Sequence, residues 1–93
     1  MAMYGMDIEQ VRQLANQLGQ KAEQIEQIVK EVTSKLSGTD WKGPDADQFR
    51  NDWQGTLSTQ LRNVAQTLRD TQTRASQNAA QQEQASGTSS VVV

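Results

Sequence analysis

The sequence predicts an all-α protein, an antiparallel helix-turn-helix hairpin that dimerises into a four-helix bundle. Two stretches carry apolar residues at helical spacing, and a short segment that holds the single proline separates them. The chain has 93 residues, of which 34% are hydrophobic, and its mean hydropathy is -0.76. Because so small and polar a chain buries little apolar surface by itself, we expect the hairpin to need a partner.

The chain divides into three expected parts. Residues 1–6 form an N-terminal arm, residues 7–83 form the hairpin, and residues 84–93 form a flexible, polar C-terminal tail. Within the hairpin we expect a first helix over 7–37, a turn over 38–44 and a second helix over 44–83.

The first helix is predicted by apolar residues that recur every seven positions in two rows. Asp7 is the expected N-cap, and Gly38 is the expected end. Leu14 and Ile28 widen the apolar stripe beyond the two rows. One row is Ile8, Ala15, Ala22, Val29 and Leu36, and the other is Val11, Leu18, Ile25 and Val32.

The turn contains the most distinctive residues of the sequence. Trp41 is a large aromatic residue in a polar connector, Gly43 permits a tight backbone path, and Pro44 suits the first position of a helix. Two interpretations of Trp41 stay open. Its ring closes the end of the hairpin, or a partner recognises it.

The second helix carries apolar residues at steps of three and four, with one extra residue near Trp53 that resembles a local stutter. Gly55 weakens the helix at the same place. Beyond Leu68 the stripe offers little apolar surface, so we expect the end of the helix to fray. The stripe consists of Ala46, Phe49, Trp53, Leu57, Leu61, Val64 and Leu68.

The two stripes together hold more apolar surface than one neighbouring helix covers. We therefore expect a second hairpin to pack across them and complete a four-helix bundle. The expected dimer interface comprises Val11, Leu14, Leu18, Ile25, Ile28, Phe49, Trp53, Leu57 and Leu61.

The composition disfavours several classes of function. Without cysteine or histidine, the chain lacks a thiolate nucleophile and the usual nitrogen ligand for metals, so we expect no enzyme, no metal site and no cofactor. An isoelectric point near 4.9 argues against nucleic-acid binding. No stretch predicts stable membrane insertion or a secretory signal peptide, so export would use a different machine.

The central Trp41-Lys42-Gly43 turn resembles that of the WXG-hundred family, the early-secreted-antigen-like substrates of type VII secretion. Long amphipathic helices flank the turn, Phe49 follows Gly43 by six residues, and the length is near one hundred. The resemblance covers roughly residues 5 to 85, and the run from Gly43 to Trp53 is similar to actinobacterial members.

The resemblance implies a non-catalytic protein that pairs with itself or with a paralogous family member. It also implies that the dimer is cytoplasmic before an FtsK/SpoIIIE-type ATPase directs its export, without a cleaved signal peptide. In the family, Trp41 and Gly43 would shape the turn, and the turn of one subunit would form a composite signal with the C-terminal end of the other.

The expected export signal departs from the family pattern, which is Tyr-x-x-x-Asp/Glu after the second helix. Tyr4 is the only tyrosine, and Ala79 stands four residues before Glu83. Either a paralogue supplies the tyrosine, or the tail is recognised differently, through an apolar tip that docks as a short peptide. The candidate signal residues are Ala79, Glu83, Val91, Val92 and Val93.

A second class of function stays open beside secretion. A cytosolic helical-hairpin adaptor would use the same apolar stripe to bind one client protein.

Overall fold

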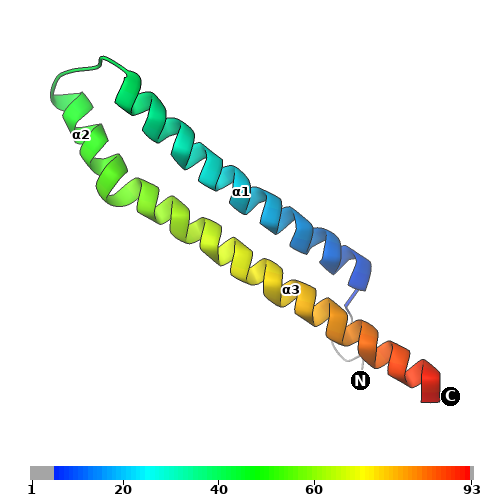
Figure 1. Cartoon of the computed structure of the whole chain (residues 1–93). Helices are drawn as coiled ribbons and strands as arrows, with labels where there is room; N and C mark the ends of the chain where they lie inside the picture. Colours follow the sequence, from blue (N-terminus) through cyan, green and yellow to red (C-terminus); the bar gives the residue numbers. More distant parts are fainter. Residues whose placement is uncertain (1–5, 93) are drawn as a thin grey trace.

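The computed structural model describes the backbone of residues 6–92 and the side chains of residues 6–85. Its elements are α1 (Ile8–Gly38), α2 (Pro44–Asp52), a π-helical segment η1 (Trp53–Leu57) and α3 (Ser58–Val92). The predicted all-α class is confirmed, because the described residues contain helices and no strand. As Figure 1 shows, α1 lies antiparallel beside α3, in a rod of 73 × 18 × 13 Å.

Both ends of α1 are held by local side chains. At the start, the Asp7 carboxylate accepts a hydrogen bond from the Gln10 N–H at 3.1 Å, so the predicted cap is confirmed. At the end, the Thr39 hydroxyl donates to the Lys35 carbonyl at 2.6 Å, which satisfies one of the carbonyls that a helix end leaves unpaired. The helix therefore begins and ends within a residue of its predicted limits.

The second long helix changes its winding where the sequence predicts an extra residue. Over Trp53–Leu57 the turns widen to a π-helix, and the Ser58 N–H donates to the Trp53 carbonyl, five residues back. A π turn accommodates one added residue within an α-helix. Gly55 lies inside this segment with open space beside it, so no tertiary contact holds the widened turn at that residue.

The C-terminal segment differs from the flexible tail predicted for residues 84–93. The backbone stays helical to Val92, well past the predicted end near residue 83. Glutamine, glutamate and alanine before Ser86 favour helix, and no proline interrupts the run. Residues 1–5 of the expected arm, Val93, and the side chains of Val91 and Val92 lie outside the described part of the chain.

The interior of the hairpin is built mostly from small side chains. At Gly19 an added Cβ would stand 2.7 Å from the terminal amide of the Gln72 side chain, so this side chain reaches from α3 to the backbone of α1 where α1 carries no Cβ. Small residues at a helix crossing allow a close approach but bury little apolar area each. The buried residues are Ala15, Ala22, Val29, Ala46, Trp53, Ser58, Ala65 and Ala79.

One side of the hairpin is joined by polar contacts between α1 and the returning helix. Arg12 forms a bidentate ion pair with Glu83, at 2.8 and 3.1 Å. Arg69 donates to Glu26, and the Trp53 indole N–H donates to the Thr33 hydroxyl at 2.9 Å. We call this side the polar edge; it consists of Arg12, Gly19, Glu26 and Thr33 of α1 and Trp53, Arg69, Gln72 and Glu83 opposite them.

Enlarging a residue of the interior should force the two helices apart. Ala22→Leu is expected to lower the free energy of unfolding by about 1–3 kcal/mol, because a fully buried alanine leaves no room for three further carbons. The measurement is urea denaturation followed by circular dichroism. Ala80→Leu places the same change at an exposed position of α3, and an equal loss there would contradict the explanation.

The polar edge should make the hairpin sensitive to acid. Hydrogen bonds from Arg69 and Arg12 hold the pKa of Glu26 and of Glu83 below the usual value of 4.5. The unfolded chain therefore takes up protons first, so these pairs stabilise the fold above about pH 4.5, and that stabilisation is lost as the pH falls through the lowered pKa values.

Urea midpoints measured at about pH 6 and about pH 3 test this dependence. Glu26→Gln should reduce the acid-induced fall in the midpoint, because the variant has no carboxylate to protonate at that position. Glu31→Gln, which removes a carboxylate that forms no ion pair among the described side chains, should leave the fall unchanged. Equal behaviour of the two variants would contradict a role for the Glu26–Arg69 pair.

Candidate interaction surface and turn

Large apolar side chains lie on the side of the hairpin opposite the polar edge. Relative to the buried Ala22, Gly19 and Glu26 are rotated one way around α1, whereas Ile25 is rotated the other way. In α3, Arg69 is rotated from the buried Ala65 in the same sense as Glu26 is from Ala22, and Val64 is rotated in the opposite sense, as Ile25 is. In antiparallel helices equal rotations fall on one side, so the apolar rows of α1 and α3 share a face.

We call this side the apolar face. Leu14 and Ile28 of α1 are 53% and 50% exposed, which is unusual for aliphatic residues on a regular stripe. In α3, Val64 is also exposed. Leu57 of the π segment, seven residues before Val64, is exposed as well. The half-buried members along the middle of the face are Val11, Leu18, Ile25, Val32, Leu61 and Leu68.

The structure places the expected interface residues unequally. Leu14, Ile28, Phe49 and Leu57 are exposed, whereas Val11, Leu18, Ile25 and Leu61 are partly covered within the hairpin. Trp53 differs from the others, because only 7% of it is exposed and its indole N–H is bonded to Thr33 on the polar edge. Trp53 therefore belongs to the interior of the hairpin and has little surface left for a second copy.

The turn depends on a glycine conformation. Gly43 has φ 121° and ψ 176°, a region that residues with a Cβ rarely enter. It serves as the N-cap of α2, and Pro44 occupies the first turn as the sequence predicts. Asp45 and Asp47 lie at the amino end of α2, where the helix dipole favours negative charge.

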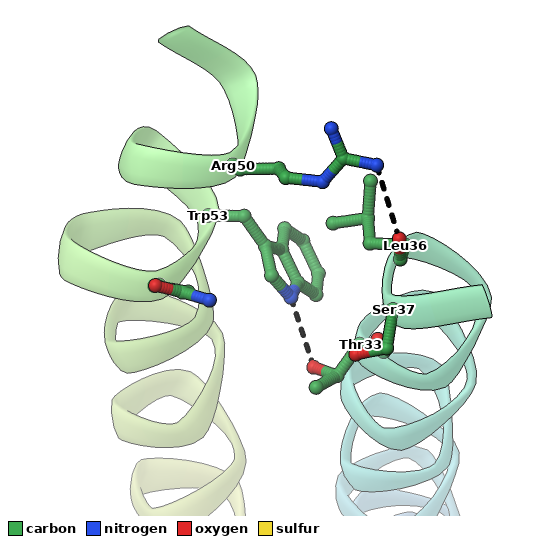
Figure 2. A pocket seen from close by; sticks show the side chains of 6 residues that line it. Thr33, Leu36, Ser37, Arg50 and Trp53 are labelled. Atoms are coloured by element: carbon green, nitrogen blue, oxygen red, sulfur yellow. Dashed lines mark hydrogen bonds between the residues drawn. The ribbon is translucent and has the colours of Figure 1, made fainter. Parts of the chain in front are cut away.

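Arg50 of α2 forms hydrogen bonds to the backbone of the segment that joins α1 to α2. Its guanidinium donates to the carbonyls of Trp41 at 2.6 Å, Thr39 at 3.0 Å and Leu36 at 3.2 Å. In Figure 2 the side chain reaches from α2 across to Leu36 at the end of α1. One side chain thus satisfies three backbone acceptors of the turn, including a carbonyl in the last turn of α1.

Three aromatic rings continue from the turn into the second helix. The Trp41 and Phe49 ring centroids are 6.4 Å apart, and those of Phe49 and Trp53 are 6.2 Å apart. The Arg50 guanidinium lies 5.9 Å from the centre of the Trp41 ring. Trp41 nevertheless stays 41% exposed, so its ring both packs against the hairpin and presents a surface at the tip.

A pocket of about 290 Å³ lies between α1 and the π segment below the turn. Two of its polar groups have partners within the protein, since the Trp53 indole N–H donates to the Thr33 hydroxyl and Arg50 donates to the Leu36 carbonyl, as the dashed lines in Figure 2 show. These donors are therefore engaged in holding the two helices together. The lining residues are Thr33, Leu36, Ser37, Arg50, Trp53 and Gln54.

Two of the candidate export residues, Ala79 and Glu83, have described side chains, and both make contacts within the hairpin. Ala79 is fully buried, and Glu83 is paired with Arg12. Neither is therefore freely displayed in this conformation. The side chains of Val91, Val92 and Val93 lie beyond the described ones.

Sequence reasoning missed Arg50, although the sequence contains a signal for it. Arg50 is the only basic residue between Lys42 and Arg62, and it follows two aspartates, Asp45 and Asp47, in α2. A lone arginine in the first turns after a Gly-Pro connector is well placed to reach back to the end of the preceding helix, where carbonyls lack partners.

Among the described residues, no group of three or more acidic, histidine or cysteine side chains could hold a metal ion. Within the same part of the chain, no helix combines the length and apolar character that a membrane span requires. Comparisons with protein-family models, curated proteins and solved structures find no match.

Removing the Arg50 guanidinium should loosen the turn. Arg50→Gln is expected to lower the free energy of unfolding by about 1–2 kcal/mol, because three carbonyls lose a charged donor. Thermal unfolding followed by circular dichroism measures the loss, and tryptophan fluorescence reports the exposure of Trp41. Arg62→Gln, at an exposed position of α3, should change neither the unfolding temperature nor the tryptophan fluorescence. An equal effect of Arg62→Gln would contradict the conclusion that Arg50 holds the turn.

Proposed function

We propose that the protein is a non-catalytic substrate or export partner of a type VII secretion system. It acts as a dimer of hairpins that an FtsK/SpoIIIE-type ATPase recognises before export from the cytoplasm. The observation that carries this proposal is the Trp41-Lys42-Gly43 turn at the tip of a two-helix rod that has an apolar face along its length.

The apolar face supports the dimer. The hairpin buries mainly alanines between its helices and leaves Leu14, Ile28 and Val64 largely uncovered. A second hairpin laid on this face would bury those side chains and give a four-helix bundle. The partner is a second copy of the chain or a paralogous hairpin.

The turn supports recognition by a partner at the tip of the rod. Trp41 is partly exposed there, and Arg50 and Phe49 fix the backbone and ring around it. An ordered tryptophan loses little conformational freedom on binding, which suits it to an interface. In this proposal the tip contacts the secretion machinery while the apolar face holds the dimer.

A cytosolic adaptor that binds one client is the second candidate. It is favoured by the placement of Ala79 and Glu83, because one is buried, the other is paired with Arg12, and no tyrosine stands at position 79. An adaptor would use the same apolar face but would remain inside the cell.

A double substitution on the apolar face tests the proposal. Leu14→Asp with Ile28→Asp should convert a dimer to a monomer with unchanged helicity and should abolish export, because the charges would be buried in the bundle. Light scattering and the culture medium of the source bacterium provide the two measurements. Gln13→Asp with Gln27→Asp, at exposed positions away from the face, should leave the dimer and its export intact.

The same export assay separates the role of the tip from that of the face. Trp41→Ala should reduce export while the dimer persists. A monomeric wild-type protein would remove the basis of the proposed bundle. Retention of the dimeric wild-type protein in the cell would favour the adaptor.

A further inference from the structure

A hollow of about 260 Å³ opens on the side of the polar edge, between α1 and α3. It is lined by Glu26, Val29, Lys30 and Arg62, and we call it the basic hollow. Val29 is buried in the interior of the hairpin, so the charged side chains form most of the surface that a partner could reach. Lys30 and Arg62 are exposed cations that come from different helices.

The carboxylate of the basic hollow is already engaged. Glu26 accepts a hydrogen bond from Arg69, and this bond, with a weaker contribution from the charge of Lys30, holds the pKa of Glu26 below its usual value. With Arg69 included, three cations surround this one carboxylate. Even when Glu23, which also acts on Arg69, is counted, the cations remain in excess.

Lys30 and Arg62 have no partner of their own within the hairpin. Neither forms an ion pair or donates a hydrogen bond to another described side chain, so neither joins α1 to α3. Like charges that line one hollow repel each other, and an anion placed between them would relieve that repulsion. The ion pairs among the described side chains are Arg12–Glu83, Lys42–Asp40 and Arg69–Glu26.

The other carboxylates near the basic hollow lie outside it. Glu31 follows Lys30 along α1 and lines a second hollow that also contains Lys35, which stands four residues after Glu31 and offsets its charge. Helical spacing places Asp70 at the back of α3. An extended polyanion such as a nucleic-acid strand would run past the two cations and meet these carboxylates, whereas a single acidic side chain would not.

We propose that the basic hollow is a docking site for a carboxylate side chain of a partner protein, held between Lys30 of α1 and Arg62 of α3. A guanidinium can bind a carboxylate through two parallel hydrogen bonds, and the ammonium adds a compact charge. The site goes beyond the proposed dimer, because a hairpin laid on the apolar face would leave the opposite side open. Since the two cations come from different helices, the partner would recognise the folded hairpin rather than either helix alone.

Titration of the isotopically labelled protein with a capped tetraglutamate peptide, followed by nuclear magnetic resonance, tests the site. At low salt the amide signals around Lys30 and Arg62 should shift, and added salt should weaken the binding because it screens the charges. Lys30→Gln with Arg62→Gln should raise the Kd about tenfold, because both charged contacts are lost. Circular dichroism should show unchanged helicity, since neither side chain joins the helices.

A matched double variant controls for the change in net charge. Lys42→Gln with Arg74→Gln removes the same two charges at exposed positions away from the basic hollow, and it should leave the Kd unchanged. Equal losses in the two double variants would overturn the inference, as would a peptide that shifts no signal near the hollow. Tighter binding of an oligonucleotide of the same charge would overturn the assignment to a protein carboxylate. The purified protein is used throughout, so the result does not depend on export.

Discussion

The close approach of α1 to α3 is the constraint on which the rest of the structure depends. Ala15, Ala22 and Ala65 are buried where the helices meet, and the terminal amide of Gln72 occupies the space beside Gly19. Small residues hold the helices near one another but remove little apolar area from water. The larger aliphatic side chains are thereby displaced to the flank of the hairpin, so the same packing that forms the hairpin also creates the apolar face.

The two flanks of the hairpin consequently have different chemistry. Charged pairs such as Arg12–Glu83 join the helices along one flank, and exposed pairs of this kind fix register more than they stabilise. At the tip, Arg50 connects α2 to the last turn of α1 through backbone carbonyls, so the turn is tied to both helices. Trp41 is held within this frame and still reaches solvent.

The fold could be predicted largely from sequence because its determinants are local. Heptad spacing, the Asp7 cap and the Gly43-Pro44 step each act within a few residues, and each is found where the sequence indicates it. The extra residue near Trp53 likewise appears as a π turn, since a break in spacing must be absorbed by the backbone.

The parts that escaped prediction depend on contacts between distant residues. The periodicity of the sequence predicts an apolar stripe but does not say which row of it faces inward, so it does not distinguish a residue in the interior of the hairpin, such as Trp53, from one at a dimer interface. The three carbonyl contacts of Arg50 join residues 9 to 14 positions apart and require the turn geometry. The composition of residues 84–93 predicts a tail, whereas the backbone is helical to Val92.

The π turn sets the rotation of α2 about the helix axis relative to α3. One residue corresponds to about 100° of rotation around a helix axis. Without the added residue at Trp53–Leu57, the side chains of α2 would be turned by that angle relative to Ala65 in α3, and Phe49 and Trp53 would point away from their present neighbours. The one added residue in the π turn thus sets the direction in which Trp41 faces around the long axis of the hairpin, and it does so without a change in the packing between α1 and α3.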